Sequence, residues 1–271
     1  MTEKSRKQAV LVLTLRIISI SACALAVYEI VPTLGIVEEF EGEHPTGAVD
    51  SVVVYAINPE TILASIGSDE TELFMPLPSE TETDTSQWLA KSYYWNDKEF
   101  MKVANALHQF VWNESLEKWS LYKAHYRIFQ CQDESSRFEA ADFIYFRRYD
   151  NYYLVHTIWI NPFNGEVGTG YTNYEYTGKR KAIDFDKADI KNASAALKLS
   201  EDNGGRDAQL KDINGCSVDI SLAPYAFKHN FLPIPFSRTD WGWHAVYTND
   251  NSEIIFEIVI DPYTGRYKTA N

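Results

Sequence analysis

The chain has 271 residues, enough for one or two domains of ordinary size. It carries 38 acidic against 25 basic residues, a net charge of −13, and so acidic a surface disfavours nucleic acid and anionic membrane surfaces as partners. Its three cysteines include no Cys-x-x-Cys pair, which argues against a structural zinc site and against dithiol redox chemistry.

The N-terminal segment, residues 1–36, has the order of an export signal. Three basic residues, Lys4, Arg6 and Lys7, precede an apolar stretch from Ala9 to Val27. As a helix this stretch would extend about 28 Å at roughly 1.5 Å per residue, close to the thickness of a hydrocarbon core. The basic end is expected to stay in the cytoplasm, which places the bulk of the chain outside it.

Three fates of this segment stay open. It can be a retained membrane anchor, although Arg16 interrupts the apolar stretch. Ala24-Leu25-Ala26 fits a signal-peptidase site, which would release a secreted protein. Cys23 follows Ile20-Ser21-Ala22 in a loose lipobox, which predicts lipidation of Cys23 after cleavage. The alternative without export is a cytoplasmic protein whose first helix is buried.

Residues 37–66 form an N-terminal extension with one expected strand. The apolar, β-branched stretch from Val49 to Ile57 predicts that strand, packed on the domain that follows. Residues 67–90 are rich in Ser, Thr, Glu, Asp and Pro and have little apolar surface to bury, so we interpret them as an acidic flexible linker.

A 23-residue segment occurs twice without a gap, as residues 143–165 and again as residues 243–265. Identical residues stand at six equivalent places: Asp150 and Asp250, Asn151 and Asn251, Ile158 and Ile258, Ile160 and Ile260, Pro162 and Pro262, and Gly165 and Gly265. Such self-similarity predicts two copies of one folding unit.

Each copy of the segment predicts a β-hairpin. Asp-Asn suits a two-residue loop, because both side chains tolerate the left-handed backbone of a type I′ turn. With the loops at Asp150-Asn151 and Asp250-Asn251, alternation along the strands predicts two buried faces. These consist of Phe143, Tyr145, Arg147, Leu154, His156, Ile158 and Ile160, and of Trp243, Ala245, Tyr247, Ile254, Phe256, Ile258 and Ile260. A turn ending at Gly165 or Gly265, and then a short strand, should follow each hairpin.

A helix and a strand are expected before each hairpin. Asn96 or Asp97 can cap a helix with apolar residues at three- and four-residue spacing through Trp112. The second copy offers a helix from Asp184 to Leu199, with Asn203-Gly204-Gly205 after its end. The strands are expected at residues 119–130 and 216–222, the second ending at Pro224.

The strand ends Ile160 to Val167 and Ile260 to Tyr267 resemble the tail of the PepSY domain, a hydrophobic strand followed by an Asp-x-x-Thr-Gly-Glu-like turn. Asp261, Thr264 and Gly265 match this pattern, whereas the first copy has Asn161 and Asn164. The resemblance covers residues 91–271. It implies a non-catalytic extracytoplasmic module, often membrane-attached and often linked to binding or restraining peptidases and cell-wall hydrolases.

The sequence therefore predicts an α+β fold of two tandem PepSY/cystatin-like units, residues 91–178 and 179–271, each a helix packed on an antiparallel sheet, after an N-terminal hydrophobic helix. The expected function is a membrane-attached binding or regulatory protein that restrains an exported peptidase or cell-wall hydrolase. The alternative is a structural subunit of a cell-surface assembly or membrane complex. Protein partners are expected in both cases, and no catalytic residue, cofactor or metal.

The remaining candidate residues have both structural and functional interpretations. Cys131 and Cys216 end the first strands of the two units, and they are either a disulfide or two buried thiols. His156 is expected to be a hydrogen-bonded core residue. His244 should lie opposite Glu257, as a cross-strand ion pair or, less simply, as an acid–base pair. Asp184, Asp186 and Asp189 fit a helix start better than a calcium loop.

The outward face of the first hairpin is the candidate surface for a partner. It carries apolar side chains that should be covered, either by the other unit or by a partner protein: Ile144, Phe146, Tyr153, Val155 and Trp159.

Overall fold

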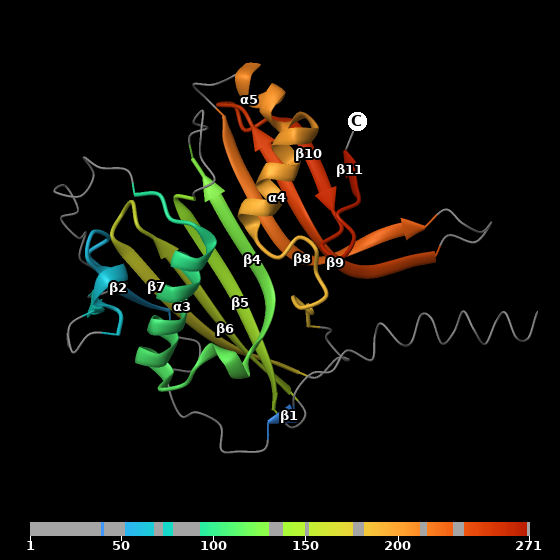
Figure 1. Ribbon diagram of the computed structural model, residues 1–271. Coiled ribbons are helices and arrows are strands. Elements are labelled where there is room, and N and C mark those ends of the chain that lie inside the picture. Colours follow the sequence, from blue (N-terminus) through green and yellow to red (C-terminus); the bar gives the residue numbers. More distant parts are fainter. Residues whose placement is uncertain are drawn as a thin grey trace, which may run out of the picture.

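The computed structural model describes residues 39–40, 52–67, 73–77, 93–129, 138–149, 152–175, 182–211, 216–229 and 236–269. The fold is α+β, with one large twisted sheet and a few helices on one of its faces (Figure 1). Residues 1–36, which carry the expected export signal with Cys23, lie outside the described residues. None of the described helices is long and apolar enough to cross a membrane.

The sheet order gives the architecture. Ten of the described strands follow each other in the order β11-β10-β9-β8-β4-β5-β6-β7-β2-β3, all antiparallel, and β1 pairs in parallel with the end of β5. In chain order the strands are β1 (Glu39–Phe40), β2 (Val53–Ala56), β3 (Met75–Pro76), β4 (Ser120–Ile128), β5 (Ala140–Tyr149), β6 (Tyr152–Asn161), β7 (Glu166–Glu175), β8 (Ser217–His229), β9 (Phe236–Thr248), β10 (Ile254–Ile260) and β11 (Tyr267–Thr269).

Two antiparallel meanders, β4 to β7 and β8 to β11, meet in the middle of this sheet. Their first strands pair from Ala124 opposite Leu222 to Ile128 opposite Val218, and we call this pairing the seam. The helices are α2 (Ile62–Ser65), α3 (Asp97–Trp112) with the short η1 (Leu116–Lys118), and α4 (Ala193–Ser200), η2 (Glu201–Gly205) and α5 (Arg206–Lys211). One continuous core of buried side chains runs beneath both sets of helices.

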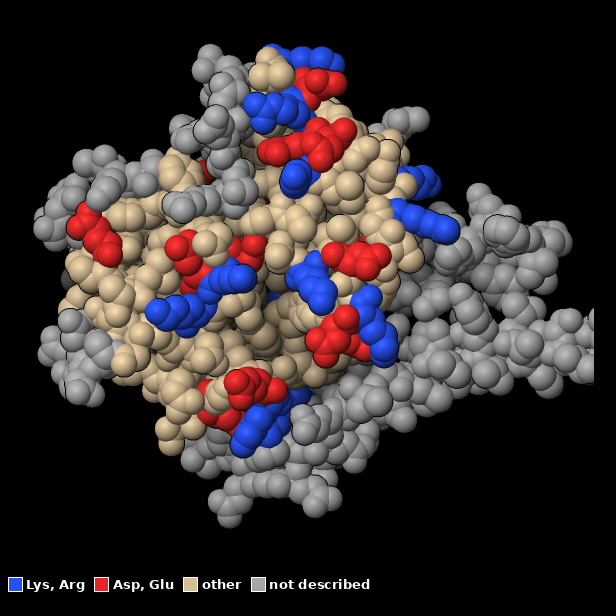
Figure 2. Space-filling model, in the orientation of Figure 1, with Lys and Arg blue, Asp and Glu red and all other residues tan. Residues whose placement is uncertain are grey.

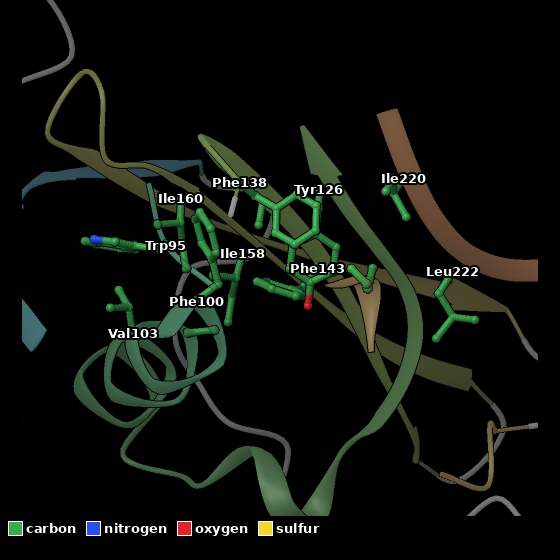
Figure 3. Packing of buried hydrophobic residues seen from close by; sticks show 14 of the residues in the cluster. Trp95, Phe100, Val103, Tyr126, Phe138, Phe143, Ile158, Ile160, Ile220 and Leu222 are labelled. Atoms are coloured by element: carbon green, nitrogen blue, oxygen red, sulfur yellow. The ribbon is translucent and has the colours of Figure 1, made fainter. Parts of the chain in front are cut away.

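The first helix is confirmed. Asn96 caps α3 by accepting from the backbone N–H groups of Lys98 and Glu99, while the Glu99 carboxylate accepts from the N–H of Asn96. This capping box satisfies donors that the first helical turn leaves unpaired. The apolar side of α3 is buried against the sheet, and in Figure 3 Phe100 and Val103 lie beside strand residues such as Ile158.

The second helix starts later than predicted. Residues 184–192 form turns and bends, and α4 begins at Ala193 after the cap Asn192, whose side chain accepts from Ala195 N–H. Asp184 serves those turns instead, since it accepts from Asp186 N–H and pairs with Lys187 at 2.7 Å. Asn203-Gly204-Gly205 follows the end of α4 at Ser200, as predicted. It forms the kink between α4 and α5, where Gly204 takes a φ of 119°.

The first hairpin has the predicted register. Tyr149 pairs with Tyr152, on either side of Asp150 and Asn151, which lie outside the described residues. The predicted inner face is buried throughout, from Phe143 to Ile160. The prediction of its buried face is confirmed.

The register of the second hairpin is shifted by two residues from the predicted one. Asp250-Asn251 is not a two-residue loop, because Thr248 pairs with Ile254 and residues 249–253 form the turn. The Asn249 side chain accepts from the N–H groups of Asn251 and Glu253 and so holds this longer loop. A shift of two keeps Ile258 and the other inward residues of β10 on the predicted face. The exception is Ile254, which is 61% exposed next to a bulge.

Two further expectations about the strands meet different outcomes. Gly165 and Gly265 both take positive φ, at 66° and 64°, and β7 and β11 follow them as predicted. The predicted break at Pro224 is wrong, because β8 continues to His229 with Pro224 opposite Trp241. The strand tolerates this proline because the pairing of β4 with β8 stops at Leu222, so that no ladder hydrogen bond to β4 requires an N–H group at residue 224.

The extension before α3 completes the sheet. The predicted strand is present as β2, and it pairs with β7. Residues 73–77, within the segment that the sequence indicates as linker, belong to the fold: Phe74 is buried in the core, and β3 pairs with β2.

Cys216 is buried at the start of β8 and is disulfide-bonded. Cys131 lies outside the described residues, so its pairing with Cys216 stays a prediction. The seam supports the pairing, because Ile128 at the end of β4 lies opposite Val218, two residues from Cys216.

Serine at either cysteine tests this pairing. Cys216→Ser and Cys131→Ser should each lower the free energy of unfolding of the oxidised protein by about 2–4 kcal/mol, because each removes the same cross-link. The double variant should lose no more than either single variant, as measured by guanidinium denaturation. Unchanged stability of Cys131→Ser would exclude residue 131 as the partner.

Candidate functional site

A pocket of about 760 Å³ lies over the seam, on the helix-bearing face of the sheet. We call it the seam pocket. Its floor comes from both meanders, with Ala124 and Tyr126 on β4, Tyr145 on β5, Leu222 on β8 and Trp243 on β9. Figure 2 shows this side of the molecule with a hollow of uncharged residues in its middle and charged side chains around it.

Three segments form the walls. The side chains of α3 line one wall through Lys98, Met101 and Asn105, and the segment 182–192 lines the opposite one. Residues 116–121, which comprise η1 and the start of β4, close one end. The pocket exists because neither α3 nor α4 covers the middle of the seam, and because Ala124 presents only a methyl group there.

The two helix starts meet beside this pocket through a single carboxylate. Asp97, the first residue of α3, accepts from the N–H groups of Ala193 and Ser194 and from the Ser194 hydroxyl at 2.6 Å. Asp97 therefore caps α4 from another helix, where a negative charge is favoured by the positive ends of both helices. It is buried, and its oxygens are occupied by this contact.

The floor is apolar and uncharged. The Trp243 indole donates to the Ile190 carbonyl at 3.0 Å, and the Tyr145 hydroxyl lies 3.5 Å from the Met101 sulfur. Burial raises the pKa of Tyr145 and of Tyr126 well above the ordinary range, so both phenols stay neutral at physiological pH. What the floor offers a ligand is ring and aliphatic surface.

The rim is polar. Lys98 and Lys191 are exposed at the starts of α3 and α4, and neither forms an ion pair with any described residue. The Asn105 amide oxygen accepts from Leu116 N–H, and the Asn192 amide oxygen accepts from Ala195 N–H, which leaves the NH₂ group of each amide as the remaining donor. Glu117 is exposed at the same rim.

A second cluster, two buried histidines, lies under the far end of α3. His108 donates from Nδ1 to the Glu114 carbonyl at 2.6 Å, so its Nε2 accepts from His156 Nδ1 at 2.9 Å. The His156 ring is stacked between Trp112 and Trp119. Burial lowers the pKa of His108, which keeps it neutral. The prediction that His156 is a hydrogen-bonded core residue is confirmed.

A third cluster, on the opposite face of the sheet, ties the meanders together across the seam. His125 on β4 contacts Asp219 on β8 at 2.7 Å and Asp142 on β5 at 3.3 Å, and Arg127 donates to Asp142. Burial alone would lower the pKa of His125, but the hydrogen bonds to the two carboxylates outweigh it and raise the pKa. Both ring nitrogens are engaged, so this histidine acts as a tie between strands. The sequence contains no local signal for this tie, because the two partners of His125 are 17 and 94 residues away.

The other candidate residues are placed as follows. His244 Nε2 lies 2.7 Å from Glu257 Oε1, although the shifted register makes the pair diagonal and sets His244 opposite Val259. Asp184, Asp186 and Asp189 lie in the segment 182–192 that precedes α4. Among the described residues, no three His, Cys, Asp or Glu side chains form a group that could hold a metal ion.

The candidate partner face on the first hairpin is partly covered. Phe146 and Val155 are 1% and 7% exposed, and Tyr122 and Ile144 pack against them. The Trp159 indole lies over Gly168 on β7, in the space where a side chain at 168 would stand. The Tyr153 side chain lies outside the described residues.

Comparison with protein-family models, with curated proteins and with solved structures finds no match.

Alanine at position 97 tests the shared cap. Asp97→Ala should lower the free energy of unfolding by about 1–2 kcal/mol, since the N–H groups of Ala193 and Ser194 lose their acceptor. The measurement is urea denaturation, with Asp189→Ala, an exposed acidic residue of the neighbouring segment, as control. Equal stability of the two variants would contradict the role of Asp97.

The pH dependence of stability tests the His125 tie. Because its folded pKa is raised, the stability that His125 contributes is fully present below its unfolded pKa of about 6.5 and is lost as the pH rises through the folded pKa. The difference in unfolding free energy between wild type and His125→Gln should therefore be largest near pH 6 and shrink towards pH 9. Parallel profiles across this range would rule out the tie.

Proposed function

We propose that the protein is a non-catalytic, extracytoplasmic binding module, attached to the membrane by its N-terminal segment, that holds a segment of a partner protein in the seam pocket. The PepSY resemblance implies an exported peptidase or cell-wall hydrolase as that partner, restrained by the binding. The observation that carries the proposal is the seam pocket itself.

The size and lining of the pocket support binding. Its volume of about 760 Å³ is within the roughly 300–1,000 Å³ of typical ligand sites, and its apolar floor with a few polar groups at the rim is the usual composition of such sites. Both meanders contribute to the floor, so the pocket depends on their being joined in one sheet.

The polar clusters of the described residues fit structural roles better than catalysis. The rings of His108, His125 and His244 are each hydrogen-bonded to a neighbouring group of the fold. None of the three lines the seam pocket. A catalytic base would have to reach a ligand bound there, and binding is therefore the simpler function.

We propose further that the two meanders are tandem PepSY/cystatin-like units. The N-cap residues Asn96 and Asn192 have the same separation in sequence as the seam partners His125 and Ser221. The same offset in residue number thus relates the helix α3 to α4 and the strand β4 to β8. These equivalent strands pair antiparallel, as an approximate two-fold axis between the meanders requires. The repeated hairpins, with their buried inner faces, support the same assignment.

The proposed compartment agrees with the cysteine chemistry. Cys216 is disulfide-bonded, and such bonds form and persist mainly in oxidising compartments outside the cytoplasm. The basic and apolar order of residues 1–36 supports the same location and a membrane attachment.

Site-specific photocrosslinking in the native membrane tests the proposal. A benzophenone amino acid in place of Ile183, which lines the pocket, should capture one exported hydrolase, and Leu121→Trp should abolish the capture by filling the pocket. The control is the same amino acid in place of Tyr267, which is exposed on β11 and outside the pocket. Capture of the hydrolase that is unchanged in Leu121→Trp would refute the proposed site. Crosslinks only between copies of this chain would favour the alternative, a subunit of a surface assembly.

A further inference from the structure

The rim of the seam pocket carries two exposed lysines at the starts of helices, where the helix dipole disfavours positive charge. Lys98 is the second residue of α3, and Lys191 directly precedes the cap of α4. Helix starts have a positive electrostatic potential, so a cation there is unfavourable by several tenths of a kcal/mol. Both lysines are exposed at the mouth of one pocket, and neither is paired with a described residue. Their presence there indicates a function that outweighs this cost.

We propose that the seam pocket recognises an extended peptide with an apolar anchor and an acidic residue beside it. The anchor lies on the floor of ring and aliphatic side chains, and the carboxylate is held between Lys98 and Lys191. This inference rests on the proposed function and adds the chemistry of the partner's segment.

The acidic residues of the lining do not cancel the attraction for an anion. The Asp97 carboxylate is buried and occupied by Ala193 and Ser194. Glu117 is exposed, but its single charge stands against two lysines. The exposed charges of the lining are thus two lysines against one glutamate, and the two lysines give the carboxylate of an acidic peptide a preferred place to bind.

The amides of the rim favour a peptide over a fatty acid. Because the Asn105 and Asn192 oxygens accept from backbone N–H groups, their NH₂ groups remain to donate. They line the two facing walls, one on α3 and one before α4. Peptide carbonyls can accept from both donors, whereas a hydrocarbon chain offers neither a donor nor an acceptor along its length.

Three fluorescein-labelled hexapeptides test the assignment by fluorescence anisotropy on the full chain. The first has a central phenylalanine–leucine pair flanked by glutamates, the second has glutamines in place of the glutamates, and the third has serines in place of the apolar pair. The first should bind more tightly than the second, and the third should not bind. Lys98→Met and Lys191→Met should each weaken the first peptide by about two- to fivefold, the range expected for an exposed ion pair, and leave the second unchanged.

The matched control is Lys198→Met, an exposed lysine at the other end of α4 and outside the pocket, which should bind like wild type. Equal affinity for the glutamate and glutamine peptides would overturn the role of the lysines. Loss of binding of the first peptide in Leu121→Trp would support the pocket as the binding site. Unchanged binding to this variant would overturn it. Binding of sodium laurate at the pocket without binding of any peptide would overturn the peptide assignment in favour of a lipid.

These outcomes are separable from failure of the proposed function. Capture of a hydrolase from Ile183 that is lost in Leu121→Trp, together with equal binding of the first two peptides, would retain the binding function and reject only the acidic recognition. Capture of a hydrolase that is unchanged in Leu121→Trp would reject the proposed function itself.

Discussion

The pairing of β4 with β8 is the constraint on which the rest of the structure depends. It joins two meanders into one sheet and places features of both on the two sides of a single line of backbone hydrogen bonds. On one side lie the shared cap at Asp97 and the seam pocket, and on the other lies His125 between the carboxylates of β5 and β8. Neither meander alone contains any of these three features. If the seam opened, the pocket floor, the cap and the tie would be lost together.

The helix starts show how the fold combines stability with binding. Asp97 and Glu99 place negative charge in the first turn of α3, which the helix dipole favours, while Lys98 stands between them with the opposite sign. The favourable charges point into the protein, to Ser194 and to Asn96, and the unfavourable one is exposed at the rim of the pocket. Alternate signs within a single turn thus serve the interior and the surface separately.

The sequence predicts local structure well where side-chain periodicity decides it. The inner face of the first hairpin and the helix α3 follow from alternation and from the spacing of apolar residues, and both are confirmed. It fails where two local solutions compete. The Asn249 side chain selects a longer loop than Asp250-Asn251, and the Asp184 side chain satisfies a turn in a segment that the pattern assigns to a helix. The seam pocket was beyond prediction, because it results from β4 and β8 becoming neighbours, which no periodicity within either strand encodes.

The antiparallel seam also bears on how such a chain could arise. If the meanders are copies of one unit, each seam strand meets its own equivalent, which is the geometry through which two identical molecules form an isologous dimer. A gene duplication that fused such a dimer would preserve the interface and release the two halves from being identical. Ala193 stands where the other helix has Asp97, so one half now supplies the carboxylate that both helix starts use. In a fused chain of this kind the two walls of the cleft over the seam can differ, whereas in a symmetric ancestor they would have been the same.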